Sequence, residues 1–361
     1  GIRPKSRGAG GQPSVVICTA MKLLLHPIAA TVAGLCITAL FAISSAFLLS
    51  LPAHHSSPPF PLLSSATATA ASSRSGWRSG RNLLFSKGDR RRSAPAGPEP
   101  SAQECVTFIS KWMPQRDRGV LPEGFIEDHV ALALAARERT AWGANVPKDV
   151  FMNYVLPYAS LVEKRESWRG LFMNTLMDLI ATSNSSAQAG ALLNDRIWDM
   201  FGVKYVAAQT PQTLSVFETL AAKNASCTGL SIFLVSACRA VGVPARVVGT
   251  PEWNTPEGGN HNWVEVYDTS TDSWLFTGAA EWSGRWDQGW FFPQPAKKQV
   301  PHDLKHGIYA TAWAPPGPFP VNPEVYVPIS WDPEDRSVRG VDVTARYLQE
   351  PTPAKQGLRI A

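Results

Sequence analysis

Charged residues are scarce in this 361-residue chain, at 17% of positions, and the two signs are unevenly distributed. The formal net charge is +5, but residues 1–100 hold 11 Lys and Arg against only 2 Asp and Glu. Residues 101–361 hold 23 Lys and Arg against 27 Asp and Glu, a net charge of −4. The part of the chain that can form a core is therefore mildly acidic. This distribution argues against a nucleic-acid partner, because such proteins carry a basic face.

Cysteine and histidine are too sparse for a covalent scaffold or an evident metal centre. Beyond residue 100 only Cys105, Cys227 and Cys238 remain, and no CxxC pair occurs. This usage excludes a disulfide framework and a cysteine-based zinc site. His302 and His306 have helical spacing but no obvious third ligand. We therefore expect neither a metal ion nor a cofactor.

The N-terminal 52 residues divide at Met21. Residues 1–20 lack apolar periodicity and are interpreted as a non-native or unstructured leader. Residues 21–52 contain a long uncharged apolar run, which predicts a signal peptide or a membrane anchor. The length of the run favours an anchor, whereas the small residues at 44–46 favour cleavage. Both interpretations stay open.

Residues 53–100 form a low-complexity segment rich in Ser, Ala, Pro and Arg. Its low hydrophobic content predicts a disordered linker. Together with the preceding apolar run, it indicates entry into the secretory route, as a membrane-anchored or secreted protein. An acid-poor, Ser- and Arg-rich stretch after a signal-like segment also resembles a bipartite plastid presequence, with Phe47 just after the small residues. Delivery to a plastid stays an alternative.

After residue 100 the amino-acid composition becomes that of a globular domain, with aromatic, apolar and charged residues mixed. Residues 101–200 carry several helical patterns, and we expect a helical subdomain, with Ser185 or Ser186 capping its last helix and Gly202 ending it. Residues 201–350 switch to short β-like runs separated by Gly and Pro, and we expect the core of the fold with a C-terminal β extension. The predicted strands are 245–249, 262–267, 273–278 and 307–313. Helices followed by antiparallel strands indicate an α+β fold.

Cys227 is the first candidate for chemistry. Apolar residues at helical spacing predict a helix over residues 228–241, stopped by Gly242 and Pro244. Cys227 then lies at the helix N-terminus, where free N–H groups and the helix dipole favour a thiolate, which is the reactive nucleophile. A cysteine before a helix is also commonly a small packed hydrophobe.

His261 is the second candidate, at the start of a β-like run after a Gly-rich loop. Strand alternation places His261, Trp263, Glu265 and Tyr267 on one face, and the valines between them on the other. We expect the valine face to pack on the helices and His261 to look into an aromatic cleft. There the imidazole could take the proton of Cys227. A carboxylate to orient it would come from Glu281 or Asp287. The surrounding tryptophans suit either an apolar or carbohydrate-stacking cleft or simple packing in the core: Trp253, Trp263, Trp282, Trp286 and Trp290.

These segments together resemble the transglutaminase-like superfamily: Cys227 opening a helix, then CRAVGVPARVVG, then HNWVEVY, then a Trp-containing strand. The resemblance is good over residues 200–290 and extends, through a bacterial-type branch, over most of residues 101–350. It implies a papain-like thiol fold with a Cys–His–Asp/Glu triad. Cys227 matches the nucleophile and His261 the general base.

The third member of the triad departs from the family pattern. The usual acid position, four residues after the Trp of the strand, is Gly278 here. The resemblance to the TGAAE-like branch implies a shift to Glu281, with Asp287 in reserve. For the family's upstream oxyanion donor, Tyr205 and Gln209 are candidates by position only.

The resemblance implies acyl transfer at amide bonds through a Cys227 thioester, as a peptidase or amidase or as a transferase, acting on a protein, a peptide or a glycoconjugate. The absence of a DxDxDG loop disfavours the calcium-activated type. The alternative is a catalytically silent module that binds peptide or glycan. Any membrane contact would be made through residues 21–52 if they are retained, and the oligomeric state is not indicated. Asn224 lies in a glycosylation pattern, and a glycan there would obstruct Cys227. Either the side chain folds into the core and stays unmodified, or the domain does not remain in a glycosylating compartment, which would favour the plastid alternative.

Overall fold

The computed structural model describes residues 99–315, 325–328 and 334–349. The interpretations of residues 1–20, 21–52 and 53–98 lie outside these ranges. Among the helices of the described ranges, none combines the length and the apolar character that a membrane span requires.

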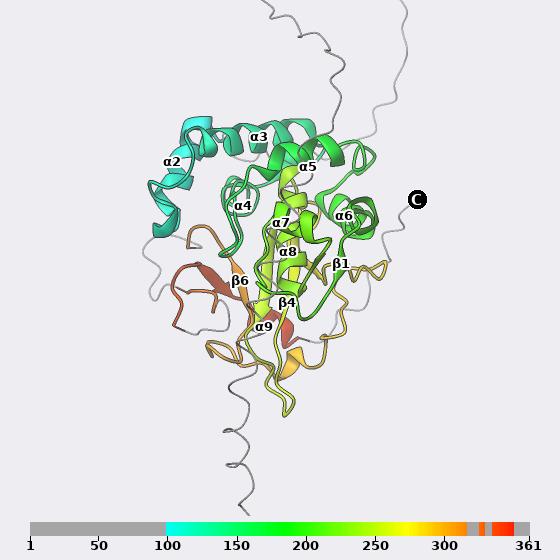
Figure 1. Cartoon of the computed structure of the whole chain (residues 1–361). Coiled ribbons are helices and arrows are strands. Elements are labelled where there is room, and N and C mark those ends of the chain that lie inside the picture. The colour runs from blue at the N-terminus through cyan, green and yellow to red at the C-terminus, as the bar shows by residue number, and fades with distance from the viewer. Residues whose placement is uncertain (1–98, 316–324, 329–333, 350–361) are drawn as a thin grey trace, which may run out of the picture. The chain divides into compact units, whose positions relative to one another are not determined.

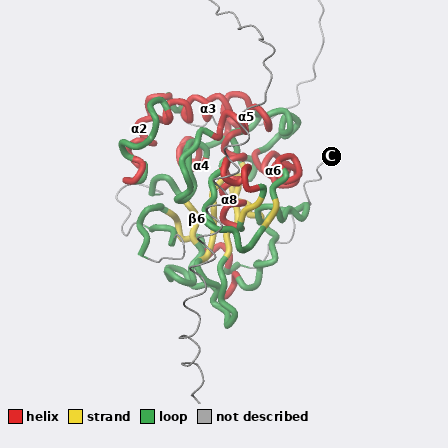
Figure 2. The backbone as a smooth tube through the Cα atoms, in the orientation of Figure 1, coloured by secondary structure: helices red, strands yellow, loops and turns green. Residues whose placement is uncertain are grey.

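Helices come first along the chain, before the strands of the main sheet (Figures 1 and 2). Ser101 and Ser185 accept hydrogen bonds from main-chain N–H groups in the first turns of the helices that they precede, and Gly202 ends the second of these with φ 65°. These caps confirm Ser185 and Gly202 as predicted boundaries. The helices before residue 202 are α2 (Ala102–Trp112), α3 (Phe125–Arg139), α4 (Lys148–Tyr154), α5 (Trp168–Leu176) and α6 (Ser186–Phe201).

The central helix is α8 (Cys227–Ala240), within one residue of the predicted bounds. Its residues from Thr228 to Ala240 are all buried, because helices α5 and α6 and the sheet surround it. Gly242 ends it with φ 75°, a conformation that a side chain disfavours. The described ranges also contain the short helices α7 (Val216–Ala222) and α9 (Thr344–Tyr347) and three 3-10 turns, at Gln115–Asp117, Gly143–Asn145 and Ala296–Lys298.

The sheet has five antiparallel strands in the order β5-β4-β3-β6-β7. This arrangement confirms the α+β fold. The predicted strands all occur, with changed ends, and β7 joins the edge through β6. A separate parallel pair joins β1 (Lys204–Tyr205) to β2 (Asn224–Ala225), just before α8. The strands of the sheet are β3 (Ala245–Thr250), β4 (His261–Asp268), β5 (Ser273–Thr277), β6 (Tyr309–Thr311) and β7 (Gly340–Asp342).

The two faces of strand β4 are buried against different partners. Val264 and Val266 belong to the large core shared with the helices, as predicted. Gly190 on α6 approaches Val266 so closely that a side chain there would press on it, which fixes the spacing between helix and sheet. Trp263 belongs to a second aromatic core on the opposite face, with Phe291 and other large side chains. Both faces of the sheet are therefore covered.

Two buried arginines fasten the segment between α4 and α5. Arg169 donates to the carbonyl oxygens of residues 155–157, and Arg239 to those of Tyr154, Ala159 and Ala245. Main-chain oxygens inside a protein need such donors, since no water reaches them. The contribution of Arg169 and Arg239 is thus to hold an irregular segment against α8.

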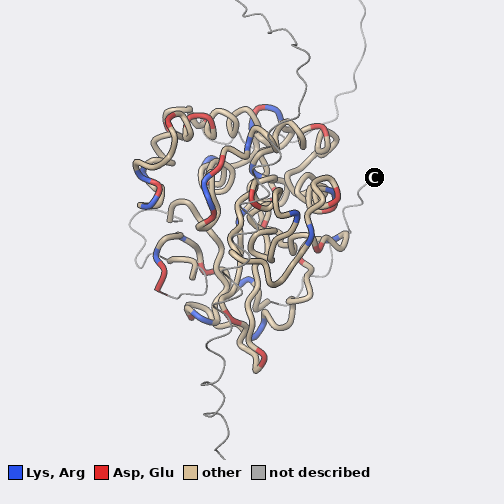
Figure 3. The backbone as a smooth tube through the Cα atoms, viewed as in Figure 1, with Lys and Arg blue, Asp and Glu red and all other residues tan. Residues whose placement is uncertain are grey.

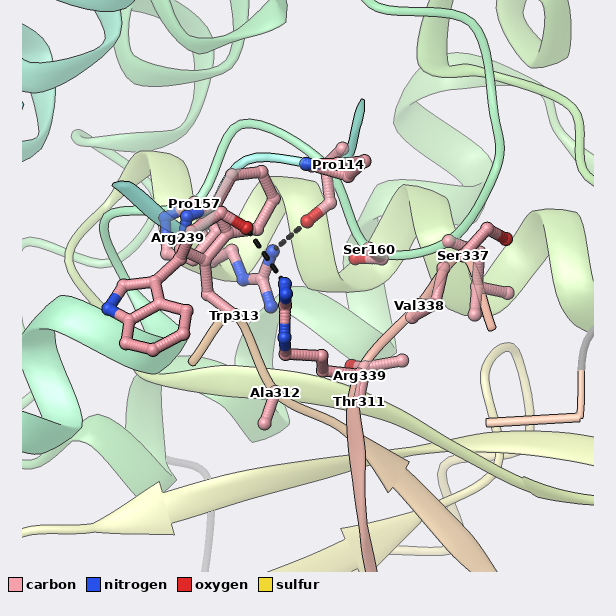
Figure 4. A pocket seen from close by; sticks show the side chains of 13 residues that line it. Pro114, Pro157, Ser160, Arg239, Thr311, Ala312, Trp313, Ser337, Val338 and Arg339 are labelled. Atoms are coloured by element: carbon pink, nitrogen blue, oxygen red, sulfur yellow. Dashed lines mark hydrogen bonds between the residues drawn. The ribbon is translucent and has the colours of Figure 1, made fainter. Parts of the chain in front are cut away.

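A small cavity beside Arg239 is also lined by arginines that bind main-chain oxygens (Figure 4). There Arg239 donates to the Ala159 carbonyl oxygen at 2.9 Å, and Arg339 donates to that of Trp112 at 3.1 Å. Both guanidinium groups serve the backbone. Elsewhere charges of both signs are interspersed along the described chain (Figure 3).

Candidate active site

Cys227 opens α8 next to the beginning of β4. Ser226 is the N-cap, and its side chain accepts a hydrogen bond from the Gly229 N–H at 3.4 Å. The Thr228 hydroxyl donates to the Asn262 side-chain oxygen at 2.8 Å, which joins the first turn of α8 to β4. The main-chain N–H of Asn262 also acts on the Cys227 thiol, where it lowers the pKa against the effect of burial. The thiol therefore lies against the residue that follows His261.

His261 is the first residue of β4 and pairs with Thr250 of β3. Its side chain is buried, with 6% exposed, so it is not a surface loop residue. The ring centroid lies 5.0 Å from that of Trp290, 5.2 Å from that of Phe291 and 5.8 Å from that of Trp263. This is the predicted aromatic surround. The Nε2 atom is buried and has no hydrogen-bond partner within the described ranges.

Burial decides the protonation of both groups. It raises the pKa of the Cys227 thiol, and hydrogen bonds from Asn262 and Thr228 oppose that rise without cancelling it. Burial also lowers the pKa of His261 to about 4. The expectation that the helix N-terminus would favour a thiolate is therefore wrong for this state, because desolvation is the larger effect. At neutral pH the thiol and the imidazole are both uncharged.

Glu281 ends a tight turn that begins at Gly278. The Glu281 N–H donates to the Gly278 carbonyl oxygen, and the Asn194 side chain from α6 bonds to Gly278 and Ala280 of the same turn. A side chain at Gly278 would overlap the Glu281 carboxylate, so Glu281 fills the space beside position 278. Burial raises the pKa of Glu281, and a hydrogen bond from the Trp290 side chain opposes the rise.

Asp287 is engaged elsewhere. Its carboxylate accepts from the Phe276 N–H at 3.0 Å and from Arg346 at 2.9 Å. Arg346 also binds Glu265, which is fully buried on β4 and accepts from Arg246 as well. Burial opposes ionisation of Glu265, but the two arginines outweigh it and hold its pKa below the usual range. Asp287 thus belongs to an ion-pair network around Arg346.

The two candidate oxyanion donors have different surroundings. Gln209 donates its side-chain amide to the Thr210 carbonyl oxygen, its own neighbour. Tyr205 lies on β1 and more than half of it is exposed. The partial burial of the rest is the main cause of its raised pKa, and the charges of Cys227 and Glu281 contribute less. The Tyr205 hydroxyl is therefore within electrostatic range of both candidate catalytic groups.

Asn224, in the glycosylation pattern before Cys227, is held by the fold. Its side-chain amide donates to the Ala222 carbonyl oxygen at 2.8 Å, and its side-chain oxygen is buried. A glycan on this nitrogen would have to replace that bond.

Within the described ranges Cys105 and Cys238 are free and fully buried thiols, whereas Cys227 is partly accessible.

Thr228, Asn262 and Asn194 contribute to the site without having been predicted, whereas Trp290 was expected among its aromatic surroundings. Only Asn262 carried a signal in the sequence, since it adjoins His261 in the HNW motif. The others act through contacts between distant segments, which no local pattern reports.

His302 and His306, the pair at helical spacing, each bind a different partner: His302 contacts Asp342 and His306 contacts a main-chain oxygen.

Residues 180–279 match the family model of the transglutaminase-like superfamily. This part of the chain carries a transglutaminase-like domain, and the family model spans α6, α8 and strands β3 to β5, with Cys227 and His261 inside it. Glu281 and Asp287 lie beyond its end.

A solved structure also resembles the chain: a candidate cysteine protease from Cytophaga hutchinsonii, with 18% sequence identity and a TM-score of 0.29. The match covers 36% of this chain and 43% of that protein. No curated protein matches the chain.

Proposed function

We propose that the protein is a thiol-dependent enzyme that transfers acyl groups from amide bonds through a thioester on Cys227. The observation that carries this proposal is the junction of α8 and β4. There the Thr228–Asn262 hydrogen bond joins the first turn of the helix that Cys227 opens to the start of the strand that begins with His261. A cysteine and a histidine on rigid elements, at the edge of an aromatic surround, suit nucleophilic catalysis.

The reaction starts from the neutral thiol and imidazole. His261 accepts the thiol proton as sulfur attacks the amide carbonyl carbon, and the free N–H groups at the start of α8 stabilise the resulting oxyanion. The imidazolium returns the proton to the departing amine as the C–N bond breaks, which leaves a thioester. Water or another amine, deprotonated by His261, attacks the thioester and releases the thiol. Glu281 orients the imidazole through Trp290, whose ring lies against His261.

The test is acetylation of Cys227 in the full chain by p-nitrophenyl acetate, followed by release of nitrophenolate and by peptide mass spectrometry. We expect a burst of nitrophenolate and a hydroxylamine-sensitive acetyl group on Cys227. The variant His261→Ala should lower the burst rate at pH 7 by about 100-fold or more, the usual contribution of a general base. Cys227→Ala is the control for acetylation elsewhere.

The main alternative is a catalytically silent transglutaminase-like module that binds peptide or glycan. The raised pKa of Cys227 and the unusual position of the acid favour this alternative. If the folded, unsubstituted protein is acetylated at Cys227 no faster than the His261→Ala variant, the enzyme proposal is wrong and the binding module replaces it.

A further inference from the structure

A groove opens beside the candidate active site, between the loop that joins β3 to β4 and the segment after β5. Its volume is about 460 Å³, which is within the range of roughly 300–1,000 Å³ for small-molecule sites. Trp253 and Trp290 are the aromatic residues that line it, and Gly258 and Gly259 line it as well. Both glycines have positive φ, so the loop conformation depends on them.

Trp290 belongs to the groove and to the candidate active site at once. Its ring centroid lies 5.0 Å from that of His261 and 6.0 Å from that of Trp253, which stands nearly perpendicular to it. Trp290 is 59% exposed, the largest exposure of any described tryptophan. A molecule seated on Trp290 is therefore presented to the edge of the site where His261 begins β4.

The groove wall that carries Trp253 is held firmly, so the site exists before a ligand arrives. Trp253 stacks on buried Trp263 with 9° between their planes, and its N–H donates to the Gly259 carbonyl oxygen at 2.7 Å. The next residue, Asn254, binds both the side chain of Gln299 and the carbonyl oxygen of Lys298 across the groove. A preformed wall lowers the ordering entropy that binding has to overcome.

The polar side chains of the groove have not been used by the fold. Glu257, Asn260, Gln294 and Lys298 line it, and within the described part of the chain none of their side chains makes a hydrogen bond or an ion pair. The set contains one negative charge, one positive charge and two amides, each of which both donates and accepts. Its charge balance suits a neutral ligand that offers many hydroxyl groups.

We propose that this groove binds a neutral oligosaccharide, with one sugar ring stacked on Trp290 and its hydroxyl groups hydrogen-bonded to the amides of Asn260 and Gln294. The C–H face of a sugar ring suits an exposed indole, whereas its rim of hydroxyls suits amides and carboxylates. A purely apolar side chain would cover the tryptophan but would gain nothing from the four polar groups. The claim that this sugar belongs to the acyl substrate rests on the proposed function. The claim that the groove binds the sugar does not.

The test is calorimetric titration of the full chain carrying Cys227→Ala with chitotriose, cellotriose and maltotriose, and with the tripeptide Gly-Phe-Gly. We expect at least one trisaccharide to bind with a millimolar or lower Kd. Adding Trp290→Ala should weaken that binding at least tenfold, and adding Gln294→Ala should weaken it severalfold. Adding Phe217→Ala, which removes an exposed aromatic ring from α7 outside the groove, should leave the Kd unchanged.

Three results would overturn this assignment: no binding of any trisaccharide to the folded protein, binding that Trp290→Ala leaves unchanged, or binding of the tripeptide alone. The last would assign the groove to peptide. Acetylation of Cys227, measured separately on the unsubstituted chain, reports on the enzyme proposal. Saccharide binding without acetylation would support the groove as a saccharide site and contradict the enzyme proposal. Acetylation without saccharide binding would support the enzyme proposal and contradict the saccharide site.

Discussion

At the scale of the residue, Glu281 and Asp287 show how surroundings separate two similar carboxylates. Glu281 follows the end of β5 by four residues and Asp287 by ten, and the sequence offered Glu281 as the third member of a triad with Asp287 in reserve. Glu281 lies over Gly278 and contacts Trp290, which covers His261. Asp287 neutralises Arg346. Their expected roles are therefore orientation for Glu281 and stability for Asp287.

The matched substitutions Glu281→Gln and Asp287→Asn should separate these roles. We expect Glu281→Gln to lower the rate of Cys227 acetylation at least tenfold, with a small change in urea stability, because orientation of the imidazole is lost. Asp287→Asn should leave the rate within about twofold and lower the free energy of unfolding by about 1 kcal/mol, a value limited by solvent screening of this half-exposed pair. Stopped-flow kinetics and urea titration measure both. The opposite pattern would make Asp287 the orienting acid.

The sequence predicted the candidate pair, Cys227 and His261, but not the contacts that surround it. Cys227 and His261 were found because a helix start and a strand start each have a local pattern. The Thr228–Asn262 bond and the contact of Trp290 with His261 join segments 34 and 29 residues apart. The net rise in the Cys227 pKa also depends on burial, and burial depends on the whole fold.

At the scale of the element, the segment between α4 and α5 depends on Arg169. It is buried, and its guanidinium group donates to the main-chain oxygens of residues 155–157 and of Arg239. Several carbonyl groups would lose their donor together if this side chain were shortened. The loss of such a buried network is among the larger effects of a single substitution.

Arg169→Met should therefore destabilise the protein by roughly 3–5 kcal/mol, since buried oxygens are left without donors. Arg196→Met is the matched control, because Arg196 is exposed on α6 and its ion pair with Asp195 is worth little. We expect the control to change the free energy of unfolding by less than about 0.5 kcal/mol. Urea denaturation followed by circular dichroism measures both variants. An equal, small effect for the two would show that the segment holds without Arg169.

Elements with strong local signals were predicted well. Capping serines, the glycines at 202 and 242 and the alternation of β4 each report a boundary or a face without tertiary information. Helices α7 and α9 and the parallel pair β1–β2 were not predicted, since they span 2 to 7 residues and depend on their neighbours. The role of Arg169 was missed because an arginine in sequence gives no sign of burial.

At the scale of the whole molecule, two buried histidines should make stability depend on pH. Burial lowers the pKa of His129 to about 3 and that of His261 to about 4, from 6.5 in the unfolded chain. Between these values the unfolded chain binds more protons than the folded one. The stabilisation is therefore complete above pH about 6.5 and is lost as the pH falls through the folded values.

We expect the free energy of unfolding to fall steadily from pH 6.5 to pH 4, with His261 alone accounting for on the order of 3 kcal/mol. His129→Gln should make the slope shallower, because one of the two titrating groups is gone. Urea titrations at half-unit pH intervals measure the slope. A flat stability profile over this range would mean that neither histidine is held neutral.

The network around Glu265 has a consequence for the order in which the protein is made. One carboxylate oxygen accepts from Arg246, which leaves the ribosome before it, but the other accepts from Arg346 and Tyr347, about 80 residues later. Until those residues emerge, a strand that carries His261 also carries a carboxylate with half of its donors missing. The nascent sheet would therefore keep Glu265 near water, and burial of this carboxylate would wait until α9 has been translated.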